Sequence, residues 1–201
     1  LGRAGFGNLT LSSGADATFS AEAAGDKAGA AVAGVGDVNG DGYADLAVGA
    51  PENDNAGAAA GSAYIVFGQA TPASMSLGSA DALLRGGDAS DYAGSAIAPA
   101  GDADGDGYAD VLVGAFYDET GGAGAGAAYL CYGGPAFAGL SLGAADATFL
   151  GESARDSAGE TLAWMPDLDG DGTDELIIGA PSEASGGGGA GAVYLIFGGA
   201  Y

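Results

Sequence analysis

The sequence predicts an all-β protein built from three copies of one small sheet. Three observations support this. The 201-residue chain matches itself when it is shifted by 65 residues, without gaps. Each copy contains four short apolar segments that are separated by clusters of Gly, Asn, Asp and Pro, which is typical of strands and turns. The apolar runs are continuous rather than alternating, as in strands that are covered on both faces.

The repeat aligns residues of the same type at the same place in every copy. A fixed period of this length indicates one supersecondary unit that packs against its neighbours. We therefore expect a single domain over residues 1–201, with repeats at approximately 9–73, 74–138 and 139–201. The aligned sets include Asp16, Asp81 and Asp146; Asp26, Asp91 and Asp156; Gly29, Gly94 and Gly159; and Asp37, Asp102 and Asp167.

The first copy shows the four expected strands in order. They are an Ala17–Phe19 segment, a small-residue run at Ala28–Ala33, Leu46–Gly49 and Tyr64–Phe67. A blade of a β-propeller has four strands and lies between two other blades. The run of Ala and Gly suits the innermost strand, where blades converge and large side chains do not fit. A glycine-rich β-sandwich is the alternative, but it gives no reason for the repeat.

Composition excludes several functional classes. The chain has 4 Lys plus Arg against 27 Asp plus Glu, a formal charge of −23, and it contains no His. It therefore lacks catalytic triads with His and His-ligated zinc or haem. The acidic balance argues against nucleic acid and against anionic membranes. No apolar run is long enough to span a bilayer. Cys131, the one cysteine, is expected to pack in the core.

Three equivalent nine-residue segments concentrate the acidic residues. They begin at Asp37, Asp102 and Asp167, and each places oxygen-bearing side chains at positions 1, 3, 5 and 9. A glycine at position 6 permits a sharp turn, so the side chains at positions 1, 3 and 5 can converge on one point. Position 7 would offer its backbone carbonyl, leaving its side chain free to vary. The predicted metal ligands are Asp37, Asn39, Asp41, Tyr43 and Asp45; Asp102, Asp104, Asp106, Tyr108 and Asp110; and Asp167, Asp169, Asp171, Thr173 and Glu175.

Hard oxygen ligands in an adaptable loop favour Ca²⁺ over Mg²⁺, so we expect three Ca²⁺ per chain. An EF-hand or dockerin loop shares the first six positions, but it requires a carboxylate at position 12 and a following helix. Position 12 here is Val48, Val113 or Ile178, within a predicted strand. That alternative therefore fails in every copy.

The segment DVNGDGYADLAVGAP at 37–51, with Phe67-Gly68 downstream, resembles the FG-GAP repeat of integrin α-subunit propellers. The resemblance covers all three copies, although the middle one has Tyr132-Gly133 in place of Phe-Gly and Phe116 in place of Pro. Glu175 stands where position 9 is usually Asp. The resemblance implies Ca²⁺ in these loops, an all-β propeller of FG-GAP blades with four antiparallel strands each, and a recognition platform of usually seven blades.

The resemblance further implies an adhesion, recognition or structural scaffold module that is extracellular or at the cell surface. No signal peptide is visible at the start of the sequence. We expect no enzymatic activity, an unidentified protein or glycan ligand, and no direct membrane insertion. The alternative is a glycosidase-like hydrolase that uses a carboxylate pair. Its candidates would be acids outside the loops, such as Glu22, Glu52, Glu119 and Glu183. A third interpretation of the negative charge is passive metal storage or adaptation to salt. The clustering of the acidic residues argues against it.

Three blades do not close a ring, because propellers generally have four to eight. The repeat begins with a fourth-strand segment at Ala17–Phe19 and ends with a third-strand segment at Tyr194–Phe197. Two chains could close a six-bladed ring if each supplied the missing strand of the other. The sequence thus favours a homodimer slightly over a fragment of a longer propeller.

Overall fold

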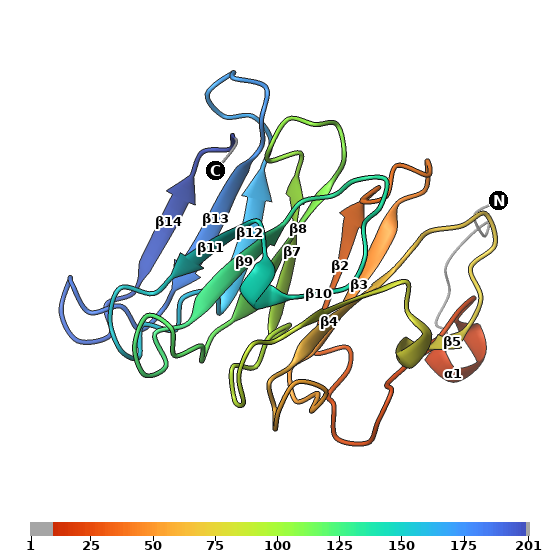
Figure 1. Ribbon diagram of the computed structural model, residues 1–201, viewed down its shortest axis with the longest axis horizontal. Coiled ribbons are helices and arrows are strands. Elements are labelled where there is room, and N and C mark those ends of the chain that lie inside the picture. Colours follow the sequence, from red (N-terminus) through yellow and green to blue (C-terminus); the bar gives the residue numbers. More distant parts are fainter. Residues whose placement is uncertain (1–9, 200–201) are drawn as a thin grey trace.

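Short strands separated by glycine-rich turns form three antiparallel sheets that stand side by side in a row (Figure 1). The computed structural model describes residues 10–199. In the first sheet, β2 (Ala31–Gly36), β3 (Asp45–Ala50), β4 (Ser62–Val66) and β6 (Ala82–Arg85) pair in that order. A short strand β10 (Leu140–Ser141) adds to β6 in parallel. We refer to the four antiparallel strands as blade one.

The second and third sheets repeat this order. Blade two contains β7 (Ala96–Gly101), β8 (Asp110–Ala115), β9 (Ala127–Cys131) and β11 (Ala147–Leu150). Blade three contains three strands among the described residues. They are β12 (Thr161–Met165), β13 (Glu175–Ala180) and β14 (Ala192–Ile196).

The expectation of four antiparallel strands is therefore met in blades one and two but not in blade three, and the row is open. The physical reason is that the sequence repeat and the blade do not begin at the same strand. Strand β6 closes blade one but lies in the second repeat, and β11 closes blade two but lies in the third. Within residues 10–199, β14 pairs with β13 and has no further strand on its outer edge.

The remaining elements are short. Strand β1 (Phe19–Ser20) pairs in parallel with β5 (Met75–Ser76), and both lie at the end of the row opposite β14 (Figure 1). A single helical turn, α1 (Leu11–Gly14), buries no side chain. Two 3₁₀ turns, η1 (Leu77–Ser79) and η2 (Leu142–Ala144), each bury one leucine in a hydrophobic cluster.

The core lies between the blades. The innermost strands β2, β7 and β12 are neighbours, as their run of small residues predicts. The faces of blades one and two meet around fully buried Val35, Ile65, Leu84 and Val111. Cys131 is also fully buried in this cluster, which confirms its expected packing role, and burial raises the pKa of its thiol to about 12.

Candidate metal centre

The three acidic segments connect the first and second strand of each blade. Strands β2 and β7 each carry a register shift, between Gly34 and Gly36 and between Pro99 and Gly101. The glycine that ends each of these strands has a positive φ, 82° at Gly36 and 67° at Gly101. Such a conformation is easily adopted by glycine and turns the chain out of the sheet into the acidic loop. The fold therefore presents equivalent loops from neighbouring blades.

The first aspartate of each loop accepts a hydrogen bond from the N–H of the glycine at position 6, which is Gly42, Gly107 or Gly172. Asp37 Oδ1 accepts hydrogen bonds from the N–H groups of Gly40 and Asp41, at 2.8 and 3.0 Å, and Oδ2 accepts one from Gly42 at 2.8 Å. Asn39 Oδ1 accepts a bond from the N–H of Asp41 at 2.9 Å, and Asp41 Oδ1 accepts one from Tyr43 at 2.9 Å. The side chains at positions 1, 3 and 5 thus turn inward along the loop.

The carboxylate at position 9 anchors the loop to its own blade. Asp45 accepts bonds from the N–H groups of Val38 and Gly68, at 2.8 and 2.7 Å. Asp110 accepts equivalent bonds from Ala103 and Gly133. Burial raises the pKa of Asp110 to about 7, although both N–H groups oppose the shift, and burial also raises the pKa of Asp45.

Two loops bring three acidic side chains close together. In the second loop, carboxylate oxygens of Asp102, Asp104 and Asp106 lie within 4.8 Å of one another. In the third loop, the group is Asp167, Asp169 and Glu175. No further group of three acidic residues meets this distance within residues 10–199. The first loop carries neutral Asn39 at position 3, so it has one carboxylate fewer than the second.

Each acidic group contains one buried oxygen without a hydrogen-bond donor among the described residues. These oxygens are Asp102 Oδ1 and Glu175 Oε1. A buried carboxylate oxygen without a partner is costly, since its desolvation is not compensated. A bound cation would supply the missing interaction. The residues present therefore fit a hard divalent cation in the second and third loops.

Glu175 fits the third loop in a way that differs from Asp45. Its Oε2 accepts the bond from Leu168 N–H at 2.8 Å, which corresponds to the bond between Asp45 and Val38. Glu175 belongs to the group with Asp167 and Asp169, and its other oxygen, Oε1, is buried without a donor among the described residues. Thr173 donates to Asp171 Oδ1 through its hydroxyl, at 2.7 Å, and this bond lowers the pKa of Asp171. Asp171 is outside the group of three.

The structure adds contacts between loops that the sequence did not predict. The N–H of Ala109 donates to the carbonyl of Asp37 at 3.2 Å, and Asp174 donates to Asp102 in the same way at 3.1 Å. A Cβ added to Gly40 would lie 2.4 Å from the ring of Tyr108. The side chain of Tyr108 therefore packs on the preceding loop, a contact that the sequence did not predict. Its carbonyl remains a predicted ligand.

The glycine that follows Phe67 also belongs to the site. Gly68 N–H binds Asp45, and a Cβ on Gly68 would lie 2.3 Å from the carbonyl oxygen of Ala44. The same approach recurs at Gly133, next to Ala109. The Phe-Gly and Tyr-Gly pairs were visible in the sequence. The contact of their glycine with the acidic loop joins residues that are distant in sequence, so only the structure reveals it.

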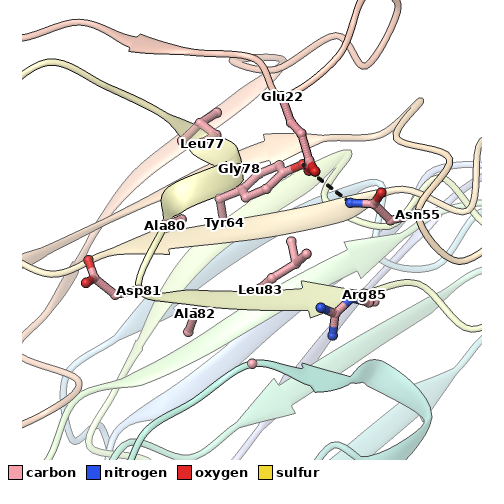
Figure 2. Close-up of a pocket in the computed structure, with 11 residues that line it drawn as sticks. Glu22, Asn55, Tyr64, Leu77, Gly78, Ala80, Asp81, Ala82, Leu83 and Arg85 are labelled. Carbon is pink, nitrogen blue, oxygen red and sulfur yellow. Dashed lines mark hydrogen bonds between the residues drawn. The ribbon is translucent and has the colours of Figure 1, made fainter.

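A separate cavity of about 620 Å³ lies against β4, β6 and η1, and no residue of the acidic loops lines it (Figure 2). Glu22 accepts hydrogen bonds there from the Tyr64 hydroxyl and the Asn55 amide, at 2.9 and 3.0 Å. Arg85 on β6 lines the opposite wall. The described residues contain no helix that is both long and apolar enough to cross a membrane.

Comparison with known proteins adds two findings. A family model described as FG-GAP repeat matches residues 28–66, 93–131 and 158–196, which is one match in each blade. The chain is 37% identical over 167 residues to human integrin alpha-IIb. That alignment covers 73% of this chain and 14% of the integrin subunit, so the chain corresponds to a small part of that protein.

Proposed function

Because the chain belongs to the FG-GAP repeat family, we propose that it is a calcium-binding, integrin-like module that serves recognition or scaffolding outside the cell or at its surface. One observation carries the calcium assignment. Asp102 Oδ1 and Glu175 Oε1 are buried without a donor within residues 10–199, and both residues belong to groups of three acidic side chains. Similarity to an integrin α-subunit supports the location and the recognition role.

Oxygen donors of the loops would hold the ions. In the second loop the ligands are Asp102, Asp104, Asp106 and Asp110, with the carbonyl of Tyr108. Equivalent positions serve in the other two loops. Bound Ca²⁺ would supply charge neutralisation and would fix the position of each loop on its blade. Carboxylates, amide oxygens and carbonyls in a flexible loop suit Ca²⁺, whereas Mg²⁺ requires stricter octahedral geometry and keeps more water.

Three ions per chain would change the electrostatics of the whole molecule. The formal charge of −23 would become about −17, because each Ca²⁺ adds two positive charges. Ions that bind the folded chain and not the unfolded chain stabilise the fold by mass action. Isothermal titration of decalcified protein is expected to give a stoichiometry near three, and chelation is expected to lower the melting temperature. A stoichiometry near zero, or melting that chelation does not change, would contradict the assignment.

A matched pair of variants distinguishes calcium binding in the second loop from nonspecific attraction by the acidic surface. Asp102→Ala removes a carboxylate from the second group, so we expect a stoichiometry near two and a smaller thermal shift with calcium. Glu160→Gln removes one exposed negative charge outside the loops. We expect the control to keep all three sites. Equal losses in the two variants would indicate nonspecific attraction of Ca²⁺ by the acidic surface.

The recognition role concerns an unidentified protein or glycan. The described acids that the hydrolase alternative would use include Glu22, which is bonded to Tyr64 and Asn55, and Glu183, which accepts bonds from the N–H and hydroxyl of Ser185. These contacts support structural roles for both carboxylates. Binding of the calcium-loaded chain to arrayed glycans and extracellular proteins, with and without chelator, tests recognition. Hydrolysis of a glycoside by the purified chain would instead support the alternative.

A further inference from the structure

The outer face of blade three exposes apolar side chains that the other two blades bury. In β14, Val193 is 74% exposed and Leu195 is 43% exposed. The equivalent pairs are Ala63 with Ile65 in β4 and Ala128 with Leu130 in β9, and all four residues are fully buried. The difference arises because blades one and two each have a following blade and a fourth strand. Blade three has neither within the described residues.

The opposite end of the row carries the complementary feature. Strand β1 pairs with β5 through Phe19 and Met75, and the pairing of β6 with β10 through Leu84 and Leu140 is the same contact one repeat later. Strand β6 is the fourth strand of blade one. Strand β1 is thus held against blade one as the fourth strand of a blade that would precede it. Val32, on the innermost strand at this end, is 64% exposed.

Within one copy, the edge of β14 and the face at β1 cannot contact each other. Strand β14 and the β1–β5 pair lie at opposite ends of the row, with the three blades between them (Figure 1). A second copy can place its β1 beside β14 of the first. The contact would continue an interface that already occurs twice, between blades one and two and between blades two and three.

We propose that two copies of this chain join head to tail, with β1 of each copy completing blade three of the other. The pairing of β4 with β6 fixes the register, because it aligns Ala63 with Leu84 and Ile65 with Ala82. Shifted by whole repeats, it places Val193 opposite Phe19 of the second copy and Leu195 opposite Ala17 of the second copy. The contact is therefore specified residue by residue.

Other contacts between blades predict the rest of the seam. Gly61 bridges Ala93, and Gly126 bridges Ala158. The next member of this series is Gly191 with Ala28 of the second copy. The two blade interfaces within the chain also contain the backbone bonds from Gly86 N–H to Gly61 O and from Gly151 N–H to Gly126 O. In the proposed interface between copies, the equivalent bond would run from Ala21 N–H of the second copy to Gly191 O.

The geometry gives six blades in the assembly, which is within the range of closed propellers. A head-to-tail contact closes a ring when the rotation per copy completes a circle, and otherwise it continues as a filament. Both seams of a two-copy ring are the same contact, so all strand edges and apolar end faces are used. An exposed edge strand beside an apolar face would make a monomer prone to aggregation.

Sedimentation of the full chain in calcium is the first test, and the expected mass is about twice the 18.9 kDa of one chain. Val193→Lys places a charge in the seam at a side chain that a single copy leaves exposed, so we expect a folded monomer. Leu11→Lys is the matched control, since Leu11 is 82% exposed on α1 and lies outside the seam. A wild-type chain that remains a folded monomer at micromolar concentration would overturn the proposal.

Cysteine cross-linking tests the register. Ala17→Cys combined with Leu195→Cys is expected to yield a disulfide-linked dimer under mild oxidation, because the two positions are opposite each other across the seam. Ala17→Cys combined with Val193→Cys is two residues out of register and should cross-link much less. Native Cys131 is fully buried. Equal cross-linking of both pairs would overturn the register, and a ladder of larger oligomers would overturn the two-copy ring.

Discussion

At the scale of single residues, glycine decides how closely the acidic loops approach their blades. A Cβ on Gly68 would collide with the carbonyl of Ala44, whereas a Cβ on Gly34 would meet nothing within 4 Å. We expect Gly68→Ala to cost about 2–4 kcal/mol of unfolding free energy. Gly34→Ala should be neutral or stabilise by up to about 1 kcal/mol. Urea denaturation of both variants measures the difference, and similar effects would argue against the steric reason.

Ligand charge predicts a difference in calcium affinity between loops. The second loop offers four carboxylates at its ligand positions, whereas the first offers three carboxylates and Asn39. Affinity in such loops rises with the number of charged ligands. We expect the second loop to bind more tightly and Asn39→Asp to narrow the gap. Titration of the variant checks this, and a weaker first site would mean that repulsion between carboxylates dominates.

We expect buried Asp91, which lies outside the acidic loops, to make the stability of the fold depend on pH. It is 3% exposed, its Oδ2 accepts a bond from the N–H of Asp88, and burial raises its pKa to about 6. The charges that face it are Asp88, Asp118 and Glu119, and all raise the pKa further. The folded state therefore holds this proton more tightly than the unfolded state, whose pKa is near 3.8. Its contribution to stability falls as pH rises from about 4 to about 6.

Replacement of Asp91 by Asn keeps an acceptor for the Asp88 N–H and removes the charge. We expect the variant to be more stable than wild type at pH 7, with a difference that shrinks toward pH 4. Urea midpoints measured across this range provide the check. A variant that loses stability equally at every pH would show that the carboxylate serves as a structural anchor and that its charge is not penalised.

At the scale of elements, the central strands and the end strand differ in coverage. All residues of β8 and β9 are buried, whereas β14 alternates between exposed and half-buried. We expect slow amide exchange in β8 and β9 under all conditions. Exchange in β14 should be slow in the dimer and fast in the monomeric Val193→Lys variant. Mass spectrometry of deuterium uptake measures this. Equal rates in both proteins would argue against strand donation at β14.

The sequence was sufficient for the repeats, the all-β class and the placement of the acidic loops between strands, because these depend on local pattern. Boundaries were less certain. The run at Ala28–Ala33 was expected as a strand, but β2 covers Ala31–Gly36, and Lys27 adopts a positive φ in the preceding turn. Alanine and glycine alone carry little information about where a strand begins. Tyr108 on Gly40 and Gly68 on Asp45 join residues far apart in sequence, so no local pattern could specify them.

At the scale of the whole molecule, charge would oppose the proposed assembly of two copies. Each chain carries a formal charge of −23, and a dimer would bring two such charges together. We expect chelation of calcium to weaken the dimer at low salt. About 1 M salt, where the Debye length is about 3 Å, should restore much of it. Sedimentation with chelator at several salt concentrations checks this. A dimer that is indifferent to both would mean that charge contributes little at the seams.

The offset between repeat and blade also has a consequence for how such chains can change length. Every blade except the last takes its outer strand from the repeat that follows, so a unit of 65 residues is never a closed structural piece. A duplication or loss of one whole unit at any point leaves every remaining strand with a partner of the same kind. Gene rearrangement can therefore lengthen or shorten the row by one blade at a time without leaving an internal strand unpaired.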